Sequence, residues 1–364
     1  MPRRTGRDRG HAGRGRYRPA RPVRPGRRRK ARARLQLRQQ RTVGRLPEAG
    51  AALRLRPPPA RPSRRTYRDA RRGGRGARRP PPHRRPEDDH PARERFVTRL
   101  DAVLAQPTPK LRDVEGNVEK ARGVLSRHAG ADLVVFPELF LSGYTTRGVD
   151  GLSLDLDGPE VGEVARLARE NGAAVIFGVP ERVSGGVANS AVCVDRTGRV
   201  VGSYRKTHLF GDERGAFVAG DELMMVELDG IKTGLLICFD VEFPEVARSL
   251  ALAGADLLVT ISANMDPFGR DHDVFATARA LENGLTHLYV NQVGPGEVFT
   301  FAGGTMAVSA DGERLAQAGP SEGEVEVSLD LSARDEGKPE HLRPNYLEQR
   351  RPQLSVRTAG RTGE

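Results

Sequence analysis

From residue 101 to residue 331 the chain alternates between short apolar runs and segments with the period of an amphipathic helix. Apolar runs such as DLVVFPE (132–138) and AAVIFGV (173–179) are typical of strands buried on both faces of a sheet. The segment 159–172 has Pro in its first turn and Gly at its end, the usual marks of helix boundaries. Strands are predicted at 101–106, 132–138, 173–179, 189–195, 198–205, 224–228, 231–238, 256–262, 286–294 and 323–331, and helices at 117–130, 159–172, 242–253 and 271–284.

Hairpin signals interrupt this alternation. MMVEL and IKTGLLIC are joined by Asp229-Gly230, a two-residue turn of the kind that hairpins favour, and another hairpin is predicted around Asp311-Gly312. Helices that alternate with buried strands, together with hairpins, indicate mixed sheets with helices outside and sheet faces packed on each other. We therefore expect an α/β fold with mixed sheets, arranged as a four-layer α-β-β-α sandwich.

The first hundred residues lack this pattern. They carry 33 Arg, one Lys and seven acidic residues, a formal charge of +27, whereas the rest of the chain carries −14. A segment with so few large apolar residues cannot bury enough surface to offset the entropy lost on ordering. We predict a disordered basic leader at 1–95, one folded domain at 96–355 and a disordered tail at 356–364.

Three explanations of the leader are open. Its charge could bind nucleic acid or another acidic surface, or it could be a targeting peptide, since transit peptides are rich in Arg and poor in acids. It could also be functionless sequence from upstream of the true start, because GC-rich DNA read in an arbitrary frame yields Arg, Pro, Gly and Ala. Aromatic residues do not interleave with the charges as base-stacking platforms do, which favours the last explanation over nucleic-acid binding.

The folded part has about 260 residues, enough for one large core. It contains no apolar run long enough to span a bilayer, so no membrane association is expected. Two cysteines in the whole chain imply no disulfide framework, and a free thiol suits the reducing cytoplasm.

Three reactive side chains lie at the ends of predicted strands. Glu138 ends DLVVFPE, Lys206 follows GRVVGSYR, and Cys238 ends TGLLIC just before a helical segment. Side chains at strand ends point into the crevice where α/β proteins place reactive groups, and this set could supply a base, an oxyanion donor and a nucleophile for acyl transfer. Free cysteines are also often ordinary core residues, which is the interpretation we prefer for Cys193 inside NSAVCVD.

The fragments around these residues strongly resemble the nitrilase superfamily of carbon–nitrogen hydrolases. The matching segments are DLVVFPELFLSGY, YRKTHLF and GLLICFDVEFPE, with further agreement in ARALENG (278–284) and around Asn291. The resemblance covers 100–352, and the leader has no counterpart in the family.

The resemblance implies a mechanism that needs neither a metal nor a cofactor. Glu138 takes the proton of Cys238, whose sulfur attacks the carbonyl carbon of an amide and forms a thioester. The oxyanion is held by Lys206 and by the backbone N–H of Phe239.

The family also has a second glutamate between the lysine and the cysteine. Glu213 is our candidate and Glu222 its competitor. Four further residues are predicted to bind the substrate: Tyr144, Glu242, Asn264 and Met265.

The branch of the superfamily is indicated by the residues after Cys238. True nitrilases usually have Trp there, whereas this chain has Phe239 and no Trp at all, which argues against nitrile cleavage. CFDVEFPE and ISANM are most similar to amidases of small amides, and acids at 240 and 242 favour an amine or neutral substrate. Two alternatives stay open: an N-carbamoyl hydrolase, and a non-enzymatic scaffold tethered to nucleic acid by the leader.

The resemblance further implies a homodimer or larger oligomer. We expect the helix at 242–253 at the interface, through a stripe of Val246, Leu250 and Ala253, although the same stripe could pack on its own sheet. The polar segment RPNYLEQRRPQL is expected to extend toward a partner subunit or over the surface.

Overall fold

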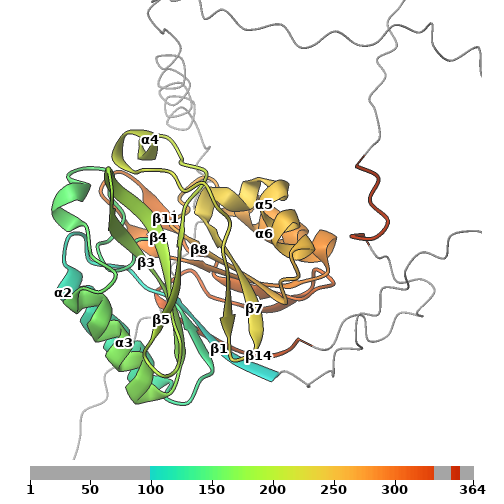
Figure 1. The fold of residues 1–364 in the computed structure, drawn as a ribbon, viewed down its shortest axis with the longest axis horizontal. Coiled ribbons are helices and arrows are strands. Elements are labelled where there is room, and N and C mark those ends of the chain that lie inside the picture. Colours follow the sequence, from blue (N-terminus) through green and yellow to red (C-terminus); the bar gives the residue numbers. More distant parts are fainter. Residues whose placement is uncertain (1–98, 332–345, 353–364) are drawn as a thin grey trace, which may run out of the picture. The chain divides into compact units, whose positions relative to one another are not determined.

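In the computed structural model of the protein, which describes residues 99–331 and 346–352, two six-stranded sheets lie face to face (Figure 1). The first has the order β14 (Gly323–Asp330), β1 (Arg99–Gln106), β2 (Leu133–Val135), β3 (Ala174–Val183), β4 (Gly186–Val194) and β5 (Val200–Arg205). The second has the order β13 (Arg314–Gln317), β12 (Met306–Val308), β9 (Thr286–Asn291), β8 (Leu257–Ser262), β7 (Ile231–Ile237) and β6 (Met225–Leu228). Strands β10 (Val293–Pro295) and β11 (Thr300–Ala302) pair with each other and form a separate two-stranded sheet.

Both sheets are mixed in the same way. Strands β1, β2 and β3 are parallel, as are β7, β8 and β9, and the strands that flank each trio are antiparallel. The carboxyl ends of the parallel strands therefore meet at one edge of each sheet, where the site residues follow.

Helices cover the outer faces of the sheets. Helices α2 (Val114–Arg127) and α3 (Pro159–Asn171) pack on the first sheet, and α5 (Pro244–Leu252) and α6 (Gly269–Asn283) pack on the second. In β1, Ala102 and Leu104 face the second sheet, while Val103 and Ala105 face the helices. Strands buried on both faces explain the apolar runs, and the predicted α-β-β-α sandwich is confirmed.

Two predicted boundaries are wrong because prolines interrupt them. Strand β2 ends at Val135, since Pro137 has no N–H to continue the ladder. The helix predicted at 242–253 begins at Pro244, after a 3₁₀ turn, η2 (Cys238–Glu242). The sequence did not predict η1 (Val149–Leu152), α4 (Glu213–Ala216) or β11. Its strand at 286–294 is divided into β9 and β10, which belong to different sheets.

The stripe expected at a subunit interface belongs to the core. Val246 and Leu250 of α5 are buried against Leu236 and Leu258 of their own sheet, whereas Ala253 is exposed. The structure therefore corrects the interface prediction for this stripe in favour of its alternative.

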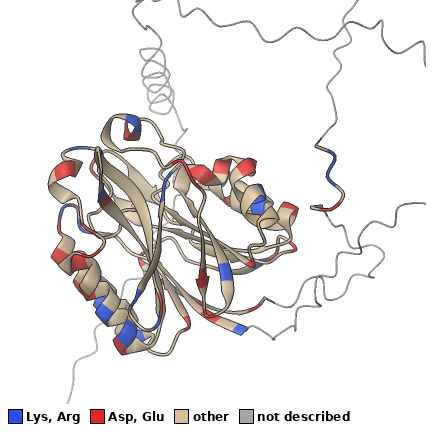
Figure 2. Ribbon diagram, viewed as in Figure 1, with Lys and Arg blue, Asp and Glu red and all other residues tan. Residues whose placement is uncertain are grey.

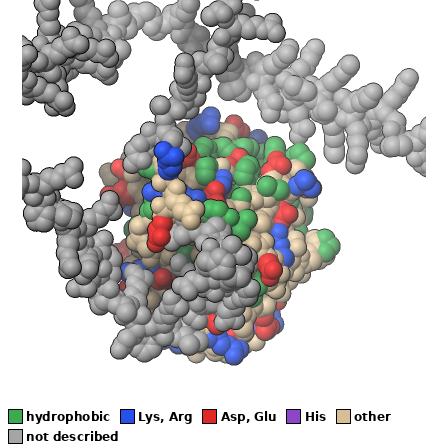
Figure 3. Space-filling model, turned by 90° about the vertical axis from the view of Figure 1, so that its right-hand side faces the viewer, with side chains coloured by type: hydrophobic (Ala, Val, Ile, Leu, Met, Phe, Trp, Pro, Cys, Tyr) green, Lys and Arg blue, Asp and Glu red, His purple; other side chains and the backbone are tan. Residues whose placement is uncertain are grey.

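Charges of both signs are mixed over the surface. Helices α2 and α3 both carry acidic and basic residues (Figure 2). Arg122 and Arg166 both pair with Glu163. The face drawn in Figure 3 likewise mixes apolar, acidic and basic side chains among the described residues. Among residues 99–331 and 346–352, none of the helices has the length and hydrophobicity that a membrane span requires. The predicted leader (1–95) and tail (356–364) lie outside the described residues.

Candidate active site

Glu138 follows β2 on a tight turn that lies against β3. The next residue, Leu139, has a φ of 48°, a conformation that is strained for a side chain with a Cβ. Gly178 of β3 makes this approach possible, because a Cβ at that position would lie 2.2 Å from the nitrogen of Leu139. The turn is also held by hydrogen bonds from Gly178 N–H to the Pro137 carbonyl and from Leu141 N–H to the Gly178 carbonyl. The backbone thereby fixes where the Glu138 carboxylate lies.

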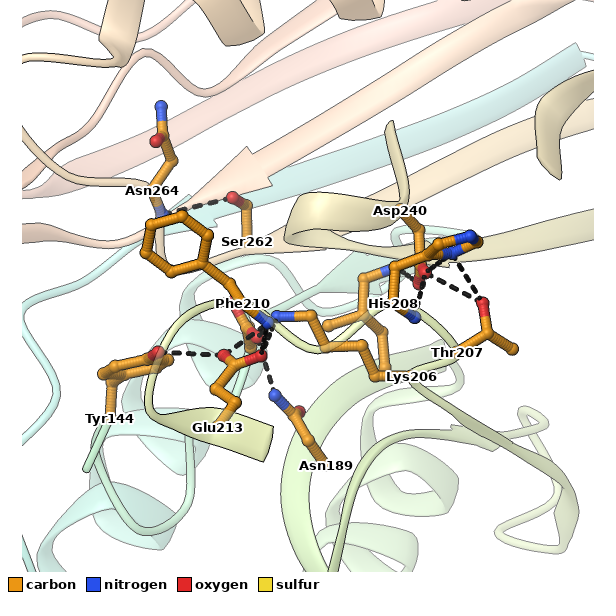
Figure 4. A network of polar contacts seen from close by, with 12 residues as sticks. Tyr144, Asn189, Lys206, Thr207, His208, Phe210, Glu213, Asp240, Ser262 and Asn264 are labelled. Carbon is orange, nitrogen blue, oxygen red and sulfur yellow. Dashed lines mark hydrogen bonds and ion pairs between the residues drawn. The ribbon is translucent and has the colours of Figure 1, made fainter. Parts of the chain in front are cut away.

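Lys206, just after β5, lies between two carboxylates. Its Nζ is 2.7 Å from Glu138 Oε1 and 2.9 Å from both oxygens of Glu213, and all three side chains are buried (Figure 4). Burial alone lowers the pKa of Lys206, but the two carboxylates more than offset it and hold the pKa well above its ordinary value. Burial raises the pKa of Glu138, and the charge of Glu213 raises it further against the opposing effect of Lys206.

Glu213 is held on α4 by two more donors. The hydroxyl of Tyr144 donates to its Oε1 at 2.8 Å, and the backbone N–H of Phe210 donates to its Oε2 at 2.8 Å. Burial and the charge of Glu213 raise the pKa of Tyr144, so its hydroxyl stays protonated and donates. The structure thus brings Glu213 and Tyr144 to Lys206, while the competitor Glu222 is exposed.

Cys238 lies at the end of β7, where the chain turns into η2. Its φ is 46°, the strained geometry of a residue held at a sharp turn, and the residue is 8% exposed. Burial raises the pKa of its thiol and the Glu138 charge raises it further, while Lys206 and the Ser262 hydroxyl lower it. The thiol is therefore protonated at neutral pH and needs a base to become a nucleophile. Cys193 belongs to the same core between the sheets but lies within β4 and is 0% exposed, as expected for a core thiol.

Asp240 connects the nucleophile turn to the lysine segment. Its carboxylate accepts hydrogen bonds from Ile237 N–H at 3.0 Å, next to Cys238, and from the Tyr204 hydroxyl at 2.8 Å, on β5. It also accepts from the Thr207 hydroxyl and from the backbone of His208, whose ring Nδ1 lies 2.8 Å away. Because β5 and β7 belong to different sheets, this carboxylate ties the two halves of the site together.

The acids at 240 and 242, which led us to expect an amine or neutral substrate, both have partners within the protein. Asp240 is fully buried and already bound to the donors named above. The carboxylate of Glu242 lies 3.4 Å from His272 Nε2, toward α6. These internal contacts take away the reason for expecting an amine, whereas the expectation of a neutral substrate stays a prediction.

The other predicted substrate-binding residues lie in different surroundings. Met265 shares an apolar cluster with Tyr144, Leu139 and Phe301 beside the Glu138 turn. Asn264 donates its backbone N–H to Asn291 Oδ1 at 2.9 Å and its side chain to the carbonyl of Phe268. The ring of Phe239 packs edge-on against that of Phe210, 5.3 Å away between centroids.

Sequence reasoning missed Asn189, whose side chain donates to Glu138 Oε1 at 2.6 Å. The available signal was a polar amide at the start of the predicted strand NSAVCVD. Across the described ranges, no three His, Cys, Asp or Glu side chains are grouped so as to hold a metal ion.

Comparison with known proteins defines the class. Residues 102–338 match the family model described as carbon–nitrogen hydrolase. The chain belongs to this family, within the nitrilase superfamily, and is an enzyme; both predictions are confirmed.

Particular relatives are similar over most of the folded part. A hydrolase in the pqqF 5′ region of Pseudomonas protegens is 41% identical, covering 71% of this chain and 91% of the relative. An (R)-stereoselective amidase from Pseudomonas sp. is 39% identical, covering 67% and 88%. The crystal structure of an amidase from Nesterenkonia sp. has a TM-score of 0.62 and 29% identity, covering 69% of this chain and 93% of that one.

The Nesterenkonia amidase has also been solved as mutants with ligands. One holds butyramide (TM-score 0.61), and in another the acetamide moiety of fluoroacetamide is attached to the active-site cysteine (TM-score 0.62). Each is 29% identical to this chain, covering 69% of it and 94% of the mutant chain.

Proposed function

We propose that the enzyme hydrolyses a small amide to a carboxylic acid and ammonia through a thioester on Cys238. The observation that carries the proposal is the buried Lys206 ammonium between Glu138 and Glu213, with their charges acting on a thiol held at a strained turn. Hydrolysis of amides is the activity that the amidase relatives support.

The first half-reaction forms the thioester. Glu138 takes the thiol proton through Oε2, the oxygen that has no hydrogen-bond partner among the described residues. As the sulfur bonds to the amide carbon, the carbonyl oxygen becomes an oxyanion, held by the Lys206 ammonium and the Phe239 N–H. Glu138 then gives the proton to the nitrogen, the C–N bond breaks, and ammonia leaves.

The second half-reaction returns the free enzyme. Water replaces ammonia, gives a proton to Glu138 and attacks the thioester carbon. The oxyanion forms again in the same place, the C–S bond breaks, and Glu138 returns the proton to the sulfur.

The environment of each group fits its role. Lys206 keeps its proton because two carboxylates raise its pKa, so it serves as a donor rather than a base. A raised pKa lets Glu138 hold a proton between its two transfers, since a carboxylic acid of ordinary pKa releases protons too readily near neutral pH. Glu213 orients the lysine without needing to exchange a proton.

The surroundings favour a neutral acyl group. Leu139, Tyr144, Met265 and Phe301 form an apolar cluster beside the site. Of the three N–H donors of Lys206, two serve Glu138 and Glu213 and the third is assigned to the oxyanion, so none is left for a substrate carboxylate of the kind that N-carbamoyl amino acids carry. A short aliphatic amide, like the butyramide bound by the Nesterenkonia amidase mutant, fits this arrangement.

We further propose that the enzyme works as a homodimer or larger oligomer in the cytoplasm, where a catalytic thiol stays reduced. The leader at 1–95 has no part in catalysis under this proposal. Nucleic acid is not expected as a partner.

The test is ammonia release from aliphatic amides, amino-acid amides, N-carbamoyl amino acids and nitriles, with Cys238→Ala as the control. We expect turnover of short neutral amides by wild type and none by the variant. Turnover confined to N-carbamoyl acids would select that alternative instead. No turnover of any compound, together with a gel shift of nucleic acid by the full chain, would favour the scaffold hypothesis.

A further inference from the structure

Asn189 contacts two of the three proposed catalytic residues. It lies on β4 and is fully buried. Its Nδ2 donates to Glu138 Oε1 at 2.6 Å, and its backbone carbonyl accepts the N–H of Lys206 at 2.8 Å. One residue of the sheet therefore contacts both the proposed base and the proposed oxyanion donor (Asn189 and Lys206 are labelled in Figure 4).

The two carboxylate oxygens of Glu138 have different surroundings. Oε1 receives both Asn189 Nδ2 and Lys206 Nζ, at 2.6 and 2.7 Å. Oε2 is buried without a partner within the described ranges. A carboxylate fixed in this way presents one defined oxygen for proton transfer.

A purely structural amide does not explain this arrangement. Oδ1 of Asn189 is buried and has no hydrogen-bond partner in the described part, a cost that stable cores usually avoid. A 180° rotation of the side-chain amide cannot give Oδ1 a partner, because Oδ1 would then face the Glu138 carboxylate, which is also an acceptor. The neighbouring Ser190 shows the structural case, with its hydroxyl donating to Glu181 Oε2 at 2.6 Å, away from the site.

We propose that Asn189 is a positioning residue for the base: its amide holds Glu138 through Oε1 and reserves Oε2 for proton exchange with Cys238. The inference rests on the proposed function. The same hydrogen bond favours the ionised carboxylate and so opposes the rise in the pKa of Glu138 that burial causes.

The test is the pH dependence of kcat/KM in Asn189→Ala and Asn189→Asp, with Ser190→Ala as the matched control on the same strand. Glu138 must be ionised to accept the thiol proton, so activity falls as the pH drops through its pKa. Loss of the donor raises that pKa, and a carboxylate at 189 raises it more, because two carboxylates in contact share one proton. The acid limb should therefore move to higher pH in Asn189→Ala, further in Asn189→Asp, and not at all in Ser190→Ala.

We also expect kcat at the optimum to fall roughly tenfold or more in both Asn189 variants, with a smaller change in KM, because a hydrogen bond to a charged group is lost. An acid limb at the wild-type position in Asn189→Ala would overturn the proposal. If Asn189→Asp does not fold, Asn189→Ser and Asn189→Ala decide in the same way.

A Glu138→Gln variant separates this inference from the proposed function. If Glu138→Gln is inactive and the Asn189 profiles are unchanged, the proposed function stands and the inference fails. If Glu138→Gln retains wild-type activity, both fail, because Glu138 is then not the base.

Discussion

Replacing Gly178 by alanine should strongly lower kcat although Gly178 has no side chain that could take part in the reaction. A Cβ at this position would lie 2.2 Å from Leu139 N, 2.6 Å from Pro137 O and 2.7 Å from Glu138 C. All three are backbone atoms, so no flexible side chain can move out of the way. The turn that carries Glu138 must move instead.

The size of the effect follows from these distances. An ordinary contact is about 3.4 Å, so the Glu138 turn must retreat from β3 by about 1 Å. A displacement of that size in a catalytic group costs roughly a hundredfold in rate. Overpacking costs about 1–3 kcal/mol of folding free energy, which lowers Tm by only about 2–4 °C per kcal/mol in a domain of this size.

The assay compares kcat for ammonia release with Tm in Gly178→Ala and in a matched variant, Gly162→Ala. Gly162 lies within α3, and a Cβ there meets no atom within 4 Å. Gly162→Ala should therefore keep wild-type kcat and gain about 0.5–1 kcal/mol of stability. Wild-type kcat in Gly178→Ala would refute the argument that the β3 contact positions Glu138.

Three further predictions concern the lysine, the tie between the sheets and the assembly. Lys206→Ala removes an oxyanion donor, so kcat should fall by roughly a hundredfold or more; near-normal kcat in steady-state assays would exclude that role. Asp240→Asn replaces one accepting oxygen by an N–H₂ group that faces other donors, so both kcat and Tm should fall. An unchanged Tm in thermal melts would show that the carboxylate does not hold the Cys238 turn. A chain that begins at residue 97 should hydrolyse amides as well as the full chain does, and light scattering should show a dimer or larger oligomer. Loss of activity would contradict the dispensable leader. A fully active monomer would contradict the proposed assembly.

Much of the fold could be predicted from the sequence because its strands are buried on both faces. Continuous apolar runs such as those around Val134 and Val259 leave few alternatives to inner strands, and helical periods between them place the outer layers. Boundaries were less predictable, because β2 stops before Pro137 and α5 starts at Pro244, whereas the apolar pattern continues across both prolines. The stripe on α5 was ambiguous for a similar reason, since periodicity shows a buried face without showing what covers it.

The site, like the fold, has a part that could be predicted from the sequence and a part that could not. Glu138, Lys206 and Cys238 could be proposed because each ends a strand, and the structure brings Glu138, Lys206 and Glu213 into direct contact. The contact of Asn189 with Glu138 spans 51 residues of sequence, and it depends on the pairing of β2 with β3 and of β3 with β4. No local pattern contains that information.

Two local signals were nevertheless present. A glycine inside the apolar strand AAVIFGV is typical of close backbone approach, and Gly178 is where the Glu138 turn lies against β3. Asp240 was visible as an acid beside the nucleophile, but its partners Tyr204 and Thr207 come from the other sheet. Proximity in sequence therefore indicated a substrate contact where the structure has an internal tie.

The central claim is that Cys238 carries the acyl group, and mass spectrometry of the enzyme trapped with a slowly hydrolysed amide tests it most directly. After digestion, we expect the added mass of the acyl group on the peptide that contains Cys238, and an unmodified Cys193 peptide because the Cys193 side chain is fully buried within β4. The adduct should be absent in Cys238→Ala. An acyl group on Cys193, or turnover by Cys238→Ala at the wild-type rate, would contradict the account.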